Sequence, residues 1–267
     1  MKKKNTGSAV ILILLLIWLL LPLAVSVIYS MFDKWTGIIP EQFNISYYVE
    51  IFKDPQFIAA LGRTLLMCIV PIVITIVVVL LALFVTKVYF PKLEKYIQII
   101  CMIPYTIQGV ILSVSILSMY VGSHTFLSNR LVMLFGAYCI IILPYIYQGI
   151  VNGMNAINMP MLIEAAQMLG ASKLYAFFKI VVPNIISAVV VSSLLAVGVI
   201  FGDYVLVRNL TGTSFQNLQI YLYQAMKIDS RKSSTVFVLI MLVTFSVSAV
   251  VLYVQNRGSR RDGKERK

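Results

Sequence analysis

Few side chains in this sequence stand in a pattern that could do chemistry. No pair of carboxylates is spaced for general acid–base work, and the single histidine, His124, has no catalytic or metal-binding partner in the pattern. Cys68, Cys101 and Cys139 lie in separate apolar stretches, and their spacing fits neither a CxxC motif nor a zinc site. Gly263-Lys264 lacks the other residues of a phosphate-binding loop. We therefore expect no catalytic residue, metal or nucleotide in this chain, packing roles for the cysteines and a solvated loop position for His124.

Asp203 stands out because it lies near the end of an apolar stretch, in Gly202-Asp203-Tyr204. A charge at the centre of a bilayer costs about 2.5–3.5 kcal/mol on insertion scales, and such a residue usually marks a transport pathway. A position close to the interface lowers that cost. Two interpretations stay open: Asp203 and Tyr204 line a translocation pathway or gate, or Asp203 has an interfacial or inter-subunit role.

A further group, Glu164-Ala165-Ala166 and Gly170, lies in a long segment between two apolar stretches. This segment, residues 152–183, is far longer than the roughly 4–6 residues of a common connection, so we expect it to be structured. Pro160 suits the first turn of a helix, and Gly170 suits the left-handed position that ends one. The pattern predicts a helix that carries Glu164-Ala165-Ala166 and stops at Gly170.

A second short helix is predicted directly after the first. Ser172 can cap its N-terminus, and it would continue until Pro183 opens the next apolar stretch. Four apolar residues would share one side of this helix: Leu174, Phe177, Phe178 and Val181. The two helices would form an amphipathic hairpin, which suits docking a partner protein or lying on a membrane surface.

The composition shows which elements must position these residues. Of the 267 residues, 60% are apolar and 12% are charged, whereas a soluble domain carries about 25% charged residues. So much apolar surface cannot be hidden in one globular core, so part of the solvent must be lipid. A helix needs about 20 mainly apolar residues to cross a bilayer. Six stretches meet this requirement: Ser8–Ser30, Gly62–Thr86, Ile97–Val121, Arg130–Val151, Asn184–Val205 and Thr235–Val254.

The net charge of +12 does not indicate nucleic-acid binding, because Lys and Arg sit in short segments beside the apolar runs. Lys2-Lys3-Lys4 precedes the first span and a basic segment follows the last one. This bias predicts that both termini and the hairpin lie in the cytoplasm. We divide the chain into a first span with an extracytoplasmic segment (1–57), a core with five spans (58–254) and a basic cytoplasmic tail (255–267).

Special residues within the spans predict how the helices pack. Pro71, Pro104 and Pro144 would curve their helices or act as hinges. Gly149-x-x-x-Gly153 and Gly198-x-x-x-Gly202 would let spans four and five approach closely. One alternative concerns the first span, because its basic start and Ala24-Val25-Ser26 are also compatible with a cleaved signal peptide.

The hairpin carries a family resemblance. Glu164-Ala165-Ala166, three residues, Gly170, nine residues and Ile180-Val181-Val182-Pro183 resemble the EAA signature of type I ABC-importer permeases. The signature ends in I-x-L-P, and Val182 stands where leucine is usual. The resemblance implies an all-α membrane protein with about six transmembrane helices and a cytoplasmic coupling helix between spans four and five. The implied coupling residues are Glu164, Ala165, Ala166, Gly170, Ile180 and Pro183.

The resemblance also implies partners. The chain would work in the bacterial plasma (inner) membrane with two ATPase subunits, a second homologous permease subunit and an extracytoplasmic solute-binding protein. ATP would bind to the ATPase subunits and not to this chain. Glu164 would offer a carboxylate to a basic group of the ATPase, Ala165 and Ala166 would allow close approach, and Gly170 would set the bend.

The substrate is indicated less directly. The outer segment from Phe43 to Leu65 is similar to polyamine-type (spermidine/putrescine) permeases, although Arg63-Thr64 replaces the Asn-Thr or Asn-Ser of that group. A polyamine is therefore the first expectation, with an aminophosphonate, ferric iron, thiamine or another small solute as alternatives. An ion-coupled secondary transporter would need acidic residues or broken helices at the midplane, and it usually has internal repeats. Asp203 alone does not meet these requirements well. A membrane scaffold without transport is the third class, and an associated ATPase would argue against both.

Overall fold

The computed structural model describes residues 6–34, 41–122, 125–212 and 214–265. It confirms the expected all-α membrane fold, with one pair of short strands within the described residues as an addition. In this part of the chain, four helices are long and apolar enough to cross a bilayer, and two bent helix pairs bring the candidate spans to six. The four are α1 (Thr6–Ser30), α3 (Pro55–Val88), α6 (Arg130–Ala156) and the first part of α13 (Ser230–Glu265).

The third predicted span, Ile97–Val121, is not one continuous helix. Its first half consists of η1 (Pro91–Leu93), α4 (Glu94–Met102) and η2 (Ile103–Thr106), and its second half is α5 (Gly109–Tyr120). The two halves meet at an angle of 101°. Pro104 lies in the 3₁₀ turn η2, and Ile107 and Gln108 then adopt extended backbone with ψ of 117° and 146°. Pro104 therefore belongs to a break in the helix and not to a gentle curve.

The fifth predicted span, Asn184–Val205, is shorter than expected. Its helix α10 runs over Ile186–Phe201 and meets the preceding segment, Lys173–Asn184, at an angle of 64°. Gly202 ends α10, and a separate helix, α11 (Val205–Thr211), begins three residues later. At the C-terminus α13 continues to Glu265, so residues 255–265 of the predicted tail extend the helix of the last span.

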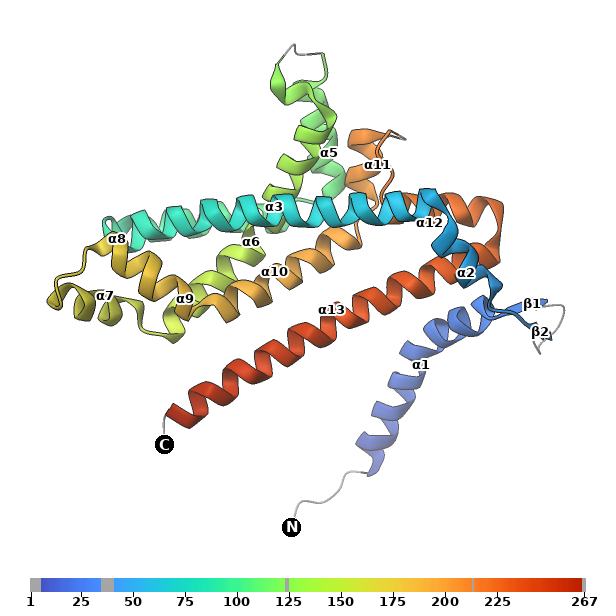
Figure 1. The fold of residues 1–267 in the computed structure, drawn as a ribbon, viewed down its shortest axis with the longest axis horizontal. Helices are drawn as coiled ribbons and strands as arrows, with labels where there is room; N and C mark the ends of the chain where they lie inside the picture. Colours follow the sequence, from blue (N-terminus) through green and yellow to red (C-terminus); the bar gives the residue numbers. More distant parts are fainter. Residues whose placement is uncertain (1–5, 35–40, 123–124, 213, 266–267) are drawn as a thin grey trace. The chain divides into compact units, whose positions relative to one another are not determined.

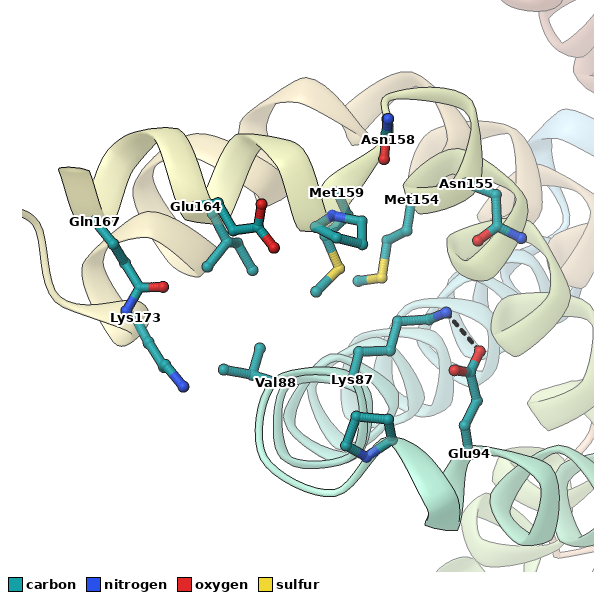
Figure 2. Close-up of a pocket in the computed structure, with 13 residues that line it drawn as sticks. Lys87, Val88, Glu94, Met154, Asn155, Asn158, Met159, Glu164, Gln167 and Lys173 are labelled. Atoms are coloured by element: carbon teal, nitrogen blue, oxygen red, sulfur yellow. Dashed lines mark hydrogen bonds and ion pairs between the residues drawn. The ribbon is translucent and has the colours of Figure 1, made fainter. Parts of the chain in front are cut away.

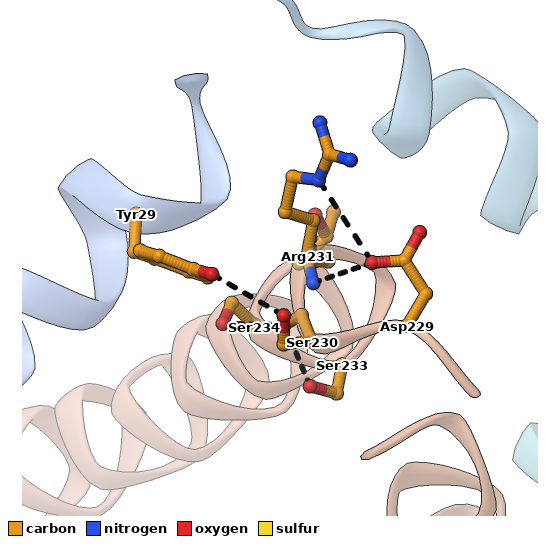
Figure 3. A network of polar contacts seen from close by, with 7 residues as sticks. Tyr29, Asp229, Ser230, Arg231, Ser233 and Ser234 are labelled. Atoms are coloured by element: carbon orange, nitrogen blue, oxygen red, sulfur yellow. Dashed lines mark hydrogen bonds and ion pairs between the residues drawn. The ribbon is translucent and has the colours of Figure 1, made fainter. Parts of the chain in front are cut away.

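The chain divides by its internal packing into two units. The first comprises Met1–Ala59 and Tyr221–Thr244, with α1, β1 (Phe32–Lys34), β2 (Glu41–Phe43), α2 (Ser46–Lys53), most of α12 (Leu218–Ile228) and the start of α13 (Figure 1). The strands are antiparallel, with Phe32 opposite Phe43. In this unit the hydroxyls of Tyr29 and Ser230 lie 3.2 Å apart and connect α1 to α13 (Figure 3).

Asp54 is a second polar connection within the first unit. Tyr221 Oη donates a hydrogen bond of 2.7 Å to Asp54 Oδ2, and Lys232 Nζ lies 3.0 Å from the same oxygen. Burial alone would raise the pKa of Asp54, but these two donors lower it below its ordinary value. Asp54 is thus ionised at neutral pH and joins α12 to α13.

The second unit comprises Ala60–Ile220 and Phe245–Lys267, and contains the remaining helices. Within it α6 and α10 pack against each other over much of their length (Figure 1). A Cβ on Gly149 would lie 2.3 Å from Ser192 Cβ, and one on Gly153 would lie 2.6 Å from Ala188 Cβ. The predicted close approach of spans four and five is confirmed at this glycine pair. The Gly198 pair is not used in the same way, because a Cβ on Gly198 would meet no described atom within 4 Å.

Candidate functional site

The long segment between spans four and five forms the expected helical hairpin. Its first helix, α7 (Met159–Met168), has Pro160 in the first turn. The chain then turns at Gly170, whose φ of +86° favours glycine. Gly170 N donates to Gln167 O (2.9 Å) and Ala171 N donates to Ala166 O (3.0 Å), which is the hydrogen-bond pattern of a Schellman C-cap. The stop predicted at Gly170 is confirmed.

The second helix of the hairpin is less regular than the sequence suggests. It consists of α8 (Lys173–Ala176), a π-helical turn labelled η4 (Phe177–Val181) and α9 (Val182–Asn184). Ser172 caps it as expected, since its Oγ accepts a hydrogen bond from Tyr175 N at 3.2 Å. Pro183 has no N–H and its ring would clash with a carbonyl one turn earlier, which gives a reason for the wider π turn.

The side of this helix that faces the protein differs from the predicted one. Phe177 and Val181 are buried and Ala176 joins them, but Leu174 is 57% exposed and Phe178 is half-buried. Leu174 therefore does not share one side with Phe177 and Val181 as predicted. The buried residues 176, 177 and 181 keep α-helical spacing, and Leu174 lies at the edge of their side.

One face of α7 has no cover within the described chain. Ile163 and Ala166 point into the protein, whereas Glu164 and Ala165 are exposed. Three apolar side chains share this open face at helical spacing: Met161 (66% exposed), Met168 (91%) and Leu169 (90%). These three residues are not among the predicted coupling residues, although the sequence carries a signal for them. Met161 and Met168 stand at i−3 and i+4 from Glu164, and Leu169 stands at i+4 from Ala165, which is the spacing of one helix face.

A cavity of about 570 Å³ borders the open face of α7 at Glu164 (Figure 2). Glu164 and Gln167 of α7 line one wall, and Lys87 and Val88 at the end of α3 line the opposite wall. Lys87 forms an ion pair with Glu94, the first residue of α4. This space separates α7 from the end of α3.

The remaining predicted coupling residues lie at the far end of the hairpin. Ile180 is half-buried in the π turn, and its carbonyl accepts a hydrogen bond from Asn184 Nδ2 at 2.8 Å. Pro183 is exposed in α9, directly before the bend into α10. They lie in the second helix, whereas Glu164, Ala165 and Ala166 lie in the first, so Ile180 and Pro183 are placed to set the junction with span five.

The carboxylate of Asp203 is used inside the chain, between α10 and α11. Its Oδ2 accepts a hydrogen bond from Tyr138 Oη of α6 (2.9 Å) and another from the backbone N–H of Leu206 (3.1 Å). The first bond joins two spans and the second caps α11. Tyr138 is 1% exposed, and its role could not be read from the sequence because it lies 65 residues from Asp203.

Two amide side chains support the same break between helices. Asn217 Nδ2 donates to the carbonyl of Asp203 (3.0 Å), and Gln219 Nε2 donates to the carbonyl of Phe201 (3.1 Å). Backbone groups freed within a membrane need such partners. The geometry favours a structural role for Asp203, and the pathway role of Asp203 and the neighbouring half-buried Tyr204 stays a prediction.

We expect Asp203→Ala to destabilise the chain and Asp203→Asn to do so much less. Alanine leaves the buried hydroxyl of Tyr138 without an acceptor, which costs about 1–3 kcal/mol, whereas asparagine keeps an acceptor oxygen. Thermal unfolding of both variants in detergent measures the difference. A normal unfolding temperature for Asp203→Asn together with lost uptake would instead favour the pathway role.

The remaining candidates for chemistry are the three cysteines and His124. Cys68, Cys101 and Cys139 are free thiols, and the first two are buried. No cluster of three potential metal ligands occurs among the described residues. His124 lies outside them.

Comparisons with known proteins place this geometry in context. A family model described as a binding-protein-dependent transport system inner membrane component matches residues 2–257. A bacterial ABC transporter that imports the acidic polysaccharide alginate has a chain of similar fold, with a TM-score of 0.65, 18% identity and coverage of 97% of this chain and 96% of that one. A second structure, of a bacterial alginate ABC transporter in complex with alginate pentasaccharide-bound periplasmic protein, gives a TM-score of 0.68 at the same identity and coverage. No curated protein sequence matches.

Proposed function

The chain belongs to the family of binding-protein-dependent transport system inner membrane components, and from this membership we propose that its hairpin couples a separate ATPase to solute import. Members of this family are permease subunits of ABC importers in the inner membrane. The chain is therefore a multi-pass membrane permease and not itself the catalyst. The residues proposed to make the coupling contact lie on α7.

The open face of α7 is the observation that carries the proposal. Met168 and Leu169 are about nine-tenths exposed at the tip of a helix that the charge bias places in the cytoplasm. Apolar side chains in such a position favour a protein partner that covers them. Glu164 and the small Ala165 on the same face would add a carboxylate and room for close approach. An amphipathic helix laid in a groove of the ATPase satisfies all of these features.

The proposed assembly contains two ATPase subunits, a second homologous permease subunit and an extracytoplasmic solute-binding protein. The periplasmic protein bound to one of the similar transporters is consistent with the last of these. With both termini in the cytoplasm, the hairpin faces the ATPase subunits and the segments that contain Asp54 and Asp229 face the solute-binding protein. Closure of the ATPase dimer would pull or push α7, and α6 and α10 would follow because they continue directly from the hairpin.

The proposed solute is a polyamine, on the resemblance of the segment Phe43 to Leu65. The two similar transporters import alginate, which is a polyanion, but a likeness at 18% identity supports only the fold of this chain and not its substrate. A polycation and a polyanion make opposite electrostatic demands on a pathway. The two substrates can therefore be separated by one transport assay.

The complex purified through this chain is expected to retain an ATPase and, in vesicles with its binding protein, to take up radiolabelled spermidine only when ATP is present. Excess unlabelled spermidine should compete, whereas alginate oligosaccharide should not. ATP-dependent uptake of labelled alginate oligosaccharide, without uptake of spermidine, would instead identify an acidic saccharide as the substrate. Uptake driven by an ion gradient without ATP, or a complex that lacks an ATPase, would contradict the coupling function.

A further inference from the structure

Four aromatic rings meet where the hairpin touches the end of α3. Phe84 lies 5.5 Å from Tyr89, 5.1 Å from Phe177 and 5.7 Å from Phe178, measured between ring centroids. Phe177 and Phe178 lie 5.1 Å from each other. We call these four residues the ring cluster. Phe84 and Tyr89 come from the end of α3 and the turn after it, whereas Phe177 and Phe178 come from the π turn.

The buried part of the ring cluster is the contact between Phe84 and Phe177. Phe177 is fully buried and Phe84 is 8% exposed, whereas Phe178 is half-buried and Tyr89 is 51% exposed at the edge of the cluster. Lys173, the first residue of α8, places its Nζ 5.4 Å from the centroid of the Tyr89 ring. This cation–π contact is a second link from the hairpin to the turn that follows α3. The cluster thus joins two segments that are far apart in the sequence.

The ring cluster matters for how a displacement of the hairpin could reach α3. The hairpin continues directly into α6 and α10, so those spans must follow it, but α3 has no such covalent link. The cavity of about 570 Å³ separates α7 from the end of α3 (Figure 2). A closely packed aromatic contact transmits displacement, whereas an open cavity does not. The ring cluster is therefore the packed route from the hairpin to α3.

We propose that the ring cluster transmits the movement of the coupling hairpin to α3, with Phe84 and Phe177 as the positioning residues. This inference rests on the proposed coupling function. It goes beyond it by assigning a non-covalent route to a span that the hairpin does not adjoin in sequence. Loss of the cluster should leave ATPase docking and the movement of α10 intact while α3 no longer follows.

The experiment uses the purified complex with its ATPase subunits, in vesicles, with the three native cysteines replaced by alanine. A spin label is attached at Val78→Cys on α3 or at Leu195→Cys on α10, positions that are 55% and 49% exposed. Spectra are compared between the nucleotide-free state and the state trapped with ATP and vanadate. Both labels should change their spectra in the parent complex. In Phe84→Leu, the change at residue 195 should remain and the change at residue 78 should be lost.

Phe57→Leu is the matched control. Phe57 lies on the same helix, is 3% exposed, and has ring contacts with Phe52 at 5.9 Å and Tyr221 at 5.6 Å. It should keep the spectral changes of both labels. If Phe84→Leu does not fold, Phe178→Leu replaces it, because Phe178 is half-buried, and Phe178→Tyr should restore the change by restoring a ring.

Two results overturn the inference in distinguishable ways. A change at residue 78 that persists in Phe84→Leu, or in Phe178→Leu where that variant replaces it, means that α3 moves by another route, while the coupling function stands. A parent complex that binds its ATPase but shows no change at residue 195 means that the hairpin does not couple at all. In that case the proposed function fails together with the inference.

Discussion

Replacing Gly170 by aspartate is expected to release the ATPase subunits from the purified complex and to abolish uptake. The new carboxylate would stand beside Met168 and Leu169, the most exposed side chains of the α7 face. When the ATPase docks on this face, the carboxylate would lose its hydrating water without gaining a hydrogen bond or ion pair in return. The left-handed backbone at φ +86° adds a cost of about 1–2 kcal/mol for a side chain. We expect retention of the ATPase to fall at least about tenfold, which corresponds to about 1.4 kcal/mol.

Gly170→Asn is the control for this prediction. Asparagine has nearly the size of aspartate and, like aspartate, occurs in the left-handed region more often than most side chains, but it carries no charge. A Cβ at residue 170 would meet no described atom within 4 Å, so neither variant should disturb packing of the hairpin itself. ATPase retained per permease after affinity purification, together with uptake, measures both. Asparagine should lose less than aspartate, and normal retention in both variants would show that the hairpin tip is not the docking site.

The hairpin was predictable because local chemistry determines it. Pro160, Gly170 and Ser172 each favour one backbone position, and each occupies that position in the structure. The spans were predictable for a similar reason, since about 20 apolar residues in a row have few soluble alternatives. Neither argument needs knowledge of which segments meet in space.

The bends and exposed faces were not predictable in the same way. In a chain that is 60% apolar, lipid-facing and protein-facing positions are both mainly apolar. The spacing of apolar residues along a helix therefore does not distinguish the two kinds of position. Leu174 illustrates this limit, because it is 57% exposed although it is as apolar as the buried Phe177 and Val181 of the same helix. The break at Ile107 and Gln108 could not be predicted from Pro104 alone, because Pro71 and Pro144 lie inside helices that continue past them.

Hydrogen bonds between residues that are distant in the sequence could not be predicted either. Asp203 was noticed for its charge, but Tyr138, Asn217 and Gln219 around the same break were not. Two of these residues lie outside the span, and hydrogen bonds between distant segments leave no local pattern. The ring cluster has the same character, because its aromatic residues look like ordinary membrane residues until the fold brings them together.

Gly149→Ala is expected to destabilise the permease by separating α6 from α10. The new methyl group would lie 2.3 Å from Ser192 Cβ and 2.8 Å from Ser192 Oγ, which is closer than real side-chain contacts allow. Overpacking of this kind costs about 1–3 kcal/mol. A cost at the upper end would also weaken coupling, because α6 and α10 are the two spans that continue from the hairpin. Denaturation of the purified chain in detergent mixtures gives the change in unfolding free energy.

The same helix and its partner supply the controls that make this prediction sharp. Gly136→Ala makes an identical change in α6 where a Cβ meets no described atom within 4 Å, so it should be neutral or gain up to about 1 kcal/mol of helix propensity. Ser192→Gly removes the group that a methyl at residue 149 would strike. The double variant Gly149→Ala/Ser192→Gly should therefore recover stability beyond the sum of the two single changes, which is the signature of direct contact in a double-mutant cycle. Strictly additive effects, or equal losses at residues 136 and 149, would mean that the close helix crossing does not govern the stability of these two spans.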